Sequence, residues 1–295
     1  MAIGSEMNET FRSGYIESQA KGLTEQGMAD TLRLDQRLDL IIEDIRNRGP
    51  LPPVPYMQTI GSHDANHFTG NMKLFALEIL GRCQATPDST ILDLGCGCGR
   101  LALPICGYLG ERGHYIGIDV WDDGIRWCTE NLTSRSDHFR FVTVESKNNY
   151  YFNDATGIDE NEYALPFITA SSVDVTFAIS LFTHLRRRDA LAYLKEVARV
   201  LKPTGTAYIT CFIIDHFFYE YAARTGNHLA VRESEQESEC FYAYSHQDFF
   251  AGFSMGAWNA MLDEAGLWSI CYETGLWAEK PGARMYQDSF ILRKR

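Results

Sequence analysis

The chain has 295 residues and a formal net charge of −12, with 45% hydrophobic residues. The acidic excess argues against broad attraction to nucleic acid and favours a small, neutral or cationic substrate. No apolar run approaches membrane-spanning length and no secretory segment is evident, so we expect a cytoplasmic protein with neither a membrane nor a nucleic-acid partner. Eight cysteines lack a repeated CxxC spacing, which predicts reduced, buried thiols rather than a zinc site.

Residues 1–75 are predicted to form a helical extension or lid ahead of the main domain over 76–295. Apolar residues at helical intervals predict an amphipathic helix over 28–48, which ends at a Gly-Pro pair. Three prolines within 51–56 predict an extended connector.

Two histidines follow this connector. His63 and His67 would share a face if their segment were helical, and this spacing is compatible with metal ligands. No third ligand can be identified, so we expect no metal site and favour a role in a lid or at a substrate entry.

The rest of the chain is organised around one stretch. The apolar run Thr90–Leu94 is followed by glycines at every second position, Gly95, Gly97 and Gly99. This pattern predicts a buried parallel strand that turns sharply into a helix. Glycine tolerates positive φ and has no Cβ, so a ligand can lie directly on this backbone beside the helix N-terminus.

The spacing of these glycines limits the ligand. Arg100 stands where a dinucleotide fingerprint needs its third glycine, and the Gly-Lys-Ser/Thr of a phosphate-binding loop is absent. Asp93 would repel a pyrophosphate, whereas its carboxylate suits an ammonium or sulfonium group. The loop therefore predicts a cradle for a small, positively charged ligand.

Helices and strands alternate after this loop. We expect helices over 101–109, 122–132, 188–201 and 255–265, and further strands over 114–118, 139–144, 173–179, 206–213, 267–272 and 287–293. With the strand at 90–94, this succession predicts an α/β fold with a Rossmann-like, seven-stranded, mostly parallel sheet and helices on both faces.

Asp119 ends the second predicted strand, about 20 residues beyond the glycines. An acidic residue at this position can accept hydrogen bonds from ribose hydroxyls, so it indicates an adenosine-bearing cofactor. Val120 and Trp121 follow at once and could pack against an adenine face, although Trp121 could equally be a structural aromatic residue.

The Asp-x-Gly-x-Gly-x-Gly pattern of residues 93–99 resembles motif I of the class I S-adenosylmethionine-dependent methyltransferases. Three further motifs resemble one subgroup of that family: Gly-Cys-Gly-Cys-Gly-Arg at 95–100, Gly-Ile-x-Trp-Cys at 124–128 and Phe-Thr-His at 182–184. The resemblance covers residues 88–213 well and the chain from 255 more loosely. It implies a last strand that runs antiparallel to its neighbours.

The resemblance also implies that S-adenosylmethionine is the cofactor. The residues implied to bind it are Asp93, Gly95, Cys96, Gly97, Gly99, Asp119, Val120, Glu145, Ser146 and Ser180. Glu145 stands where related enzymes place an acidic acceptor for the adenine amino group, and most of them use Asp there.

His184 is the candidate catalytic residue. It follows the fourth predicted strand, and chemistry in open α/β sheets takes place beyond the carboxyl ends of strands. Imidazole titrates near neutral pH and can take the proton of a hydroxyl acceptor. A histidine here could instead only order the loop.

Residues 215–253 lie where this superfamily often inserts substrate-binding elements, and they are rich in aromatic residues. The rings could stack on a sugar or flat metabolite, surround a cation, or form a small hydrophobic core. The favoured function is O-methylation of a hydroxyl on a sugar or secondary metabolite. The alternatives are a C-methyltransferase of an isoprenoid-like or other natural product, with Glu220 or His184 taking the final proton, and a noncatalytic cofactor-binding protein. A homodimer is compatible with the sequence.

Overall fold

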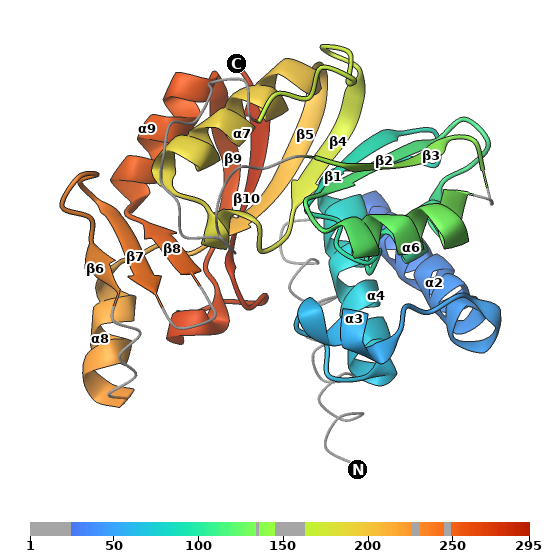
Figure 1. Ribbon diagram of the computed structural model, residues 1–295, viewed down its shortest axis with the longest axis horizontal. Helices are drawn as coiled ribbons and strands as arrows, with labels where there is room; N and C mark the ends of the chain where they lie inside the picture. The colour runs from blue at the N-terminus through green and yellow to red at the C-terminus, as the bar shows by residue number, and fades with distance from the viewer. Residues whose placement is uncertain (1–24, 134–135, 145–162, 226–230, 245–248) are drawn as a thin grey trace. The chain divides into compact units, whose positions relative to one another are not determined.

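The computed structural model describes residues 25–133, 136–144, 163–225, 231–244 and 249–295. Seven strands form one sheet in the order β3-β2-β1-β4-β5-β10-β9 (Figure 1). Their bounds are β1 Thr90–Leu94, β2 His114–Asp119, β3 Phe139–Thr143, β4 Val173–Ala178, β5 Leu201–Cys211, β9 Leu267–Glu273 and β10 Asp288–Lys294. β4 runs parallel to β1 and β5, whereas β10 is antiparallel to β5 and β9. The predicted α/β class and antiparallel last strand are confirmed.

The chain divides into two compact units. The helical unit comprises the described residues up to 88, together with 96–115 and 121–141. The sheet unit comprises 89–95, 116–120 and the described residues from 142 to 295. Each unit has its own packing.

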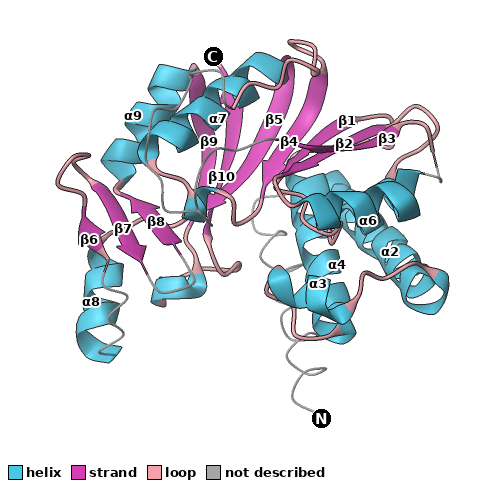
Figure 2. Cartoon of the chain, in the orientation of Figure 1, coloured by secondary structure: helices cyan, strands magenta, loops and turns pink. Residues whose placement is uncertain are grey.

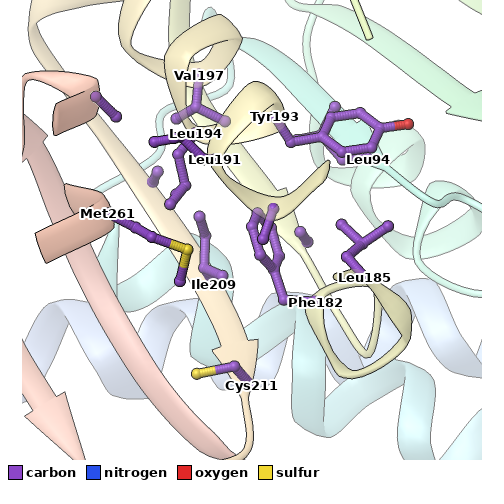
Figure 3. Close-up of a cluster of buried hydrophobic side chains, with 14 of the residues drawn as sticks. Leu94, Phe182, Leu185, Leu191, Tyr193, Leu194, Val197, Ile209, Cys211 and Met261 are labelled. Carbon is purple, nitrogen blue, oxygen red and sulfur yellow. The ribbon is translucent and has the colours of Figure 1, made fainter. Parts of the chain in front are cut away.

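In the sheet unit, α7 (Arg187–Val200) and α9 (Met255–Ala265) pack against each other (Figure 2). Their apolar faces join the side chains of β1, β4 and β5 in the main core, part of which is drawn in Figure 3. Helix α9 has the predicted bounds because its ends are capped locally: the Oγ of Ser254 accepts from the Ala257 amide, and Gly266 ends it with a φ of +74°.

The helical unit contains α2 Glu25–Arg48, α3 Val54–Thr59, α4 Ala65–Arg82, α5 Ala102–Tyr108 and α6 Asp122–Leu132. Helix α2 packs on α4 and α5. Lys73 on α4 forms ion pairs with two residues of α2, Asp35, at 2.8 Å, and Asp39.

One local expectation in this unit was wrong. The segment 51–56 is not wholly extended, because α3 begins at Val54 and its Pro55 lies in the first turn, where a helix needs no amide donor. Helix α4 begins at Ala65, after Asp64 caps it by accepting from the His67 amide at 2.8 Å. His63 therefore precedes the helix, and the two histidines do not share a helical face.

Strand β5 begins earlier than predicted, at Leu201 rather than Thr206. The pairing with β4 shifts register between Val173–Leu201 and Val175–Thr206, so residues 202–205 bulge out as an irregular segment. The residues between the predicted helix and the predicted strand, 202–205, are thus part of β5.

The described residues of 215–253 form helix α8 (His216–Thr225) and a second, antiparallel sheet of β6 Arg232–Glu233, β7 Cys240–Tyr244 and β8 Phe249–Phe253. Most described rings of this segment are packed inside. Phe218, Tyr221, Phe241 and Phe250 join Phe212 and Trp277 in a small core, and Tyr242, Phe249 and Phe253 belong to the main core. Tyr219 is 53% exposed. The small-core interpretation therefore holds for four of these rings, and three others lie in the main core.

All eight cysteines are free thiols, and seven of them are buried, as expected. None of the helices among the described residues is both long and apolar enough to cross a membrane.

Candidate functional site

The turn after β1 has the backbone that its glycines predict. Gly95, Gly97 and Gly99 have φ values of +81°, +54° and +81°, which L-residues rarely adopt. Gly95 is exposed, and among the described atoms the nearest to a Cβ built there is one of Leu181, at an ordinary 3.7 Å. A ligand can therefore approach the backbone closely at Gly95.

The other two glycines are also required by the packing of the protein. A Cβ at Gly97 would approach Cγ2 of Ile60 to 3.0 Å, and one at Gly99 would approach Sγ of Cys128 to 2.9 Å. Gly124 on α6 packs closely against the turn, since a Cβ built at Gly124 would stand 2.7 Å from the carbonyl oxygen of Gly97. Residues 97–99 are thus held between α6 and the end of α3, within the helical unit.

In the sheet unit, the acidic residues lie at adjacent strand ends. The Gly95 amide donates to the Ile118 carbonyl at 2.9 Å, so the turn after β1 is joined to the end of β2. Asp93 is 2% exposed, Asp119 is half-buried and Val120 is 46% exposed. The structure thus brings Asp93, Gly95, Asp119 and Val120 to one edge of the sheet.

Ser180, just beyond β4, has a strained backbone. Its φ of +61° is unusual for a residue with a side chain. Two threonines hold it: its amide donates to Oγ1 of Thr210 at 2.9 Å, and its carbonyl accepts from Oγ1 of Thr183 at 2.8 Å. Thr210 in turn donates to Oε1 of Gln287 at 2.6 Å, a length typical of an O–H···O bond. Conformations of this kind are concentrated at functional sites.

Thr210 and Gln287 were not recognised in the sequence. They lie 30 and 77 residues away from the residues they bond, Ser180 and Thr210 respectively, and no local pattern connects such positions. A serine with positive φ leaves no sequence signal either, because glycine is the usual marker of that conformation.

His184 ends a short 3-10 helix, Phe182–His184, and its side chain is exposed. Its Nδ1 lies 2.8 Å from the carbonyl oxygen of Phe249. Because a carbonyl oxygen only accepts, Nδ1 carries the hydrogen, and the lone pair of the neutral ring is on Nε2. Phe182 anchors the turn in the core, edge-on to the Trp258 ring at 5.6 Å.

Arg186, two residues after His184, lies over two buried aromatic rings. The guanidinium of Arg186 lies 5.2 Å from the ring centroid of Tyr242 and 5.5 Å from that of Phe249. The Tyr242 hydroxyl accepts from the Arg187 amide at 2.9 Å and donates to Glu237. Burial raises the pKa of Tyr242, so this phenol stays protonated and acts as a fixed hydrogen-bonding group.

The arrangement fits an adenosine-bearing sulfonium cofactor in two respects. The exposed, positive-φ Gly95 leaves room beside the backbone, and the half-buried carboxylate of Asp119 ends the next strand. Glu145 and Ser146 lie outside the described residues, so their predicted contacts with the cofactor stay predictions. Within the described ranges, no group of three His, Cys, Asp or Glu residues is placed to hold a metal ion. The rings of His63 and His67 stack on each other with centroids 5.2 Å apart.

Comparison with known families identifies the central part of the chain. Residues 91–205 match the family model of a methyltransferase domain. An O-methyltransferase of Pyrenophora dematioidea is 29% identical over 139 residues, which are 47% of this chain and 45% of the relative. A demethylmenaquinone methyltransferase of Lactococcus lactis subsp. lactis is 31% identical over 127 residues, 43% of this chain and 42% of the relative. The chain thus spans less than half the length of the curated relatives it matches.

Solved structures agree on the fold. The PH0226 protein of Pyrococcus horikoshii OT3 is similar with a TM-score of 0.53 and 17% identity, over 79% of this chain and 93% of that one. A chain of the Haloferax volcanii complex between the Trm112 methyltransferase activator and its candidate methyltransferase gives a TM-score of 0.50 and 16% identity, over 82% and 96% of the two chains.

Residues 91–205 are thus similar to a methyltransferase domain, which supports the predicted enzyme class for that part of the chain. The subgroup indicated by the Gly-Cys-Gly-Cys-Gly-Arg and Phe-Thr-His motifs stays a prediction.

Proposed function

We propose that the chain is an S-adenosylmethionine-dependent methyltransferase that methylates a hydroxyl of a small molecule such as a sugar or secondary metabolite. The observation that carries this proposal is the pair of carboxylates at adjacent strand ends. Asp93 is the last residue but one of β1, before the glycine turn, Asp119 ends β2, and the Gly95 amide joins the two ends through Ile118. In the proposal, Asp119 accepts from the ribose hydroxyls and Asp93 faces the cationic part of the cofactor.

When bound, S-adenosylmethionine supplies an electrophilic methyl group on a positively charged sulfur. The protein then has to align the acceptor oxygen and receive its proton. His184 suits the second task, because the bond to Phe249 fixes the hydrogen on Nδ1 and leaves the Nε2 lone pair to accept. The new O–C bond forms as the S–C bond breaks, and the acceptor's proton passes to Nε2.

The Ser180 turn would support the same site. Its strained backbone stands at the carboxyl end of β4, next to β1, and it is held by Thr183 and Thr210. Holding this backbone in place before binding would avoid an ordering cost when the ligand arrives.

The names of the two relatives support a small acceptor, since one is an O-methyltransferase and the other carries demethylmenaquinone in its name. A C-methyltransferase of an isoprenoid-like compound is the second candidate, and the second of these names favours it. A noncatalytic cofactor-binding protein is the third.

The proposal is tested with the purified 295-residue chain. Calorimetry should detect binding of S-adenosylhomocysteine and no comparable binding of a nicotinamide dinucleotide. Binding of the dinucleotide without binding of S-adenosylhomocysteine would exclude the assignment. Turnover of S-adenosylmethionine is then measured with a panel of sugars, phenols and aliphatic alcohols. The position of the transferred methyl carbon in the product, read by NMR, separates O- from C-methylation. Binding without turnover of any acceptor would favour the noncatalytic alternative.

A further inference from the structure

We propose that residues 54–62 form a cover on the glycine turn, and that Arg100 is the positioning residue that fastens this cover and so sets the affinity for the cofactor. This inference rests on the proposed function for its ligand, and every contact that carries it lies within the helical unit. The cover consists of α3 and the chain that leads from it toward α4.

Arg100 stands directly after the last glycine of the turn and reaches back to the cover. Its Nη1 lies 3.2 Å from the Ile60 carbonyl oxygen and 3.4 Å from Oγ of Ser62. Ser62 is fully buried, and the guanidinium lies 5.7 Å from the ring centroid of Phe75 on α4. The residue that rules out a dinucleotide fingerprint is therefore used to bind the protein's own N-terminal segment.

The cover also contacts the turn directly. The thiol of Cys98 lies 3.6 Å from the carbonyl oxygen of Tyr56, and Ile60 is the side chain that leaves no room for a Cβ at Gly97. Residues 97 and 98 of the turn, and Arg100 directly after it, thus each lie close to a residue of the cover.

The cover reaches the chain beyond β2 as well. The Tyr56 ring lies 5.0 Å from the ring of Trp121, which follows Asp119 and Val120 in sequence. Trp121 is itself wedged against α6, where its ring would stand 2.7 Å from a Cβ at Gly124. Within the helical unit, the same short segment therefore contacts both the glycine turn and Trp121.

These contacts matter because the turn is held in a conformation that few chains favour by themselves. Glycines with positive φ have many alternative conformations, so the turn needs contacts from outside to stay ordered. If the cover loosens, only a fraction of molecules holds the binding-competent turn, and the apparent affinity falls by that fraction. Arg100 is suited to this task since its planar guanidinium can bond two acceptors and stack on a ring, whereas lysine has a single ammonium.

The test uses the 295-residue chain and three variants, with S-adenosylhomocysteine as the probe. Arg100→Met removes the donors with little loss of apolar stem, Arg100→Lys keeps the charge, and Arg112→Met removes an exposed arginine that pairs with Asp88. Calorimetry should show a Kd raised about ten- to hundredfold in Arg100→Met, as expected for losing hydrogen bonds from a charged group, with a smaller rise in Arg100→Lys and none in Arg112→Met.

Amide hydrogen exchange gives a second measurement that needs no ligand. Exchange in residues 54–62 should rise in unliganded Arg100→Met, while exchange in α9 stays at the wild-type level. In the wild type, S-adenosylhomocysteine should slow exchange in the same residues.

The outcomes separate the two proposals. If the wild type fails to bind S-adenosylhomocysteine, the proposed function fails, and unchanged exchange in 54–62 would remove the fastening role too. If the wild type binds and both Arg100 variants bind equally well, the positioning role is wrong. If Arg100→Met does not fold, an Arg100→Lys variant with wild-type affinity and wild-type exchange in 54–62 contradicts the inference.

Discussion

The Nδ1 atom of His184 lies 2.8 Å from the backbone carbonyl oxygen of Phe249, a residue 65 positions further along the chain. The contact fixes the hydrogen on Nδ1 and so leaves Nε2 as the basic nitrogen of the ring. It also allows the general-base role of His184 to be separated from a role in ordering its loop.

His184→Asn should keep a donor toward Phe249, because the Asn amide occupies the place of Nδ1, while the basic nitrogen is lost. We expect His184→Asn and His184→Ala both to reduce turnover by about 10² to 10⁴, with unchanged affinity for S-adenosylhomocysteine. Single-turnover assays with a weakly acidic alcohol provide the measurement. If His184→Asn keeps wild-type turnover and only His184→Ala loses it, the histidine orders the loop and takes no proton.

Asp119→Ala should weaken binding of S-adenosylhomocysteine by about 1–3 kcal/mol, because half-buried hydrogen bonds to the ribose would be lost. Calorimetry measures the change. Asp137→Ala is the matched control, since Asp137 is an exposed carboxylate between α6 and β3. Equal affinities in wild type and Asp119→Ala would remove Asp119 from the cofactor site.

Thr210→Val should lower the free energy of unfolding by about 1–3 kcal/mol, because it leaves the Ser180 amide without its acceptor in a buried strand end. Valine has nearly the shape of threonine, so the loss reports the hydroxyl rather than a cavity. Thr210→Ser keeps the hydroxyl and should retain most of this part of the stability. Urea unfolding of the three proteins checks the expectation, and similar losses in both variants would assign the effect to packing.

Lys280 is fully buried, with Nζ 3.0 Å from each of Asp288 Oδ1 and Asp215 Oδ2 and 2.7 Å from the Ile213 carbonyl oxygen. Lys280→Met should lower the free energy of unfolding by about 3–5 kcal/mol, since it leaves the buried carboxylate of Asp288 without its cation. The double variant Lys280→Met with Asp288→Asn should lose less than the sum of the two single changes. Additive losses in urea unfolding would show that the two residues do not act as a pair.

Cys240 provides a prediction at alkaline pH. Burial, aided by nearby Glu237, raises the pKa of this thiol from 9.0 to about 11. Between these values the unfolded chain loses the proton while the folded chain keeps it, so the free energy of unfolding should fall as pH rises from 9 to 11. The contribution is at most about 1.4 kcal/mol per pH unit. Denaturant unfolding should be measured for wild type and Cys240→Ala. The difference between their free energies of unfolding should be constant up to pH 8, and above pH 9 the free energy of unfolding of the wild type should fall relative to that of the variant. A constant difference up to pH 11 would contradict the raised pKa.

The sequence by itself determined the elements whose signals are local. The helices over 122–132 and 255–265 have the predicted bounds, because apolar spacing in both, and the end caps of the second, involve residues within a few positions of one another. The strand at 90–94 and its glycines likewise identified the turn at the carboxyl end of β1. Together with Asp119, these local patterns were sufficient for the α/β class and for the methyltransferase domain that the comparisons support.

Only the tertiary structure decided which residues hold the site in place. The Phe249 carbonyl that orients His184, the Thr210 and Gln287 side chains behind Ser180, and the Ile60 carbonyl that receives Arg100 come from distant parts of the chain. Such partners depend on where strands and helices meet after folding, and hydrophobic periodicity carries no record of that. The same reason explains the prolines of α3: they favoured an extended connector by local rules, but the folded chain uses them at the start of a helix, where a missing amide donor costs nothing.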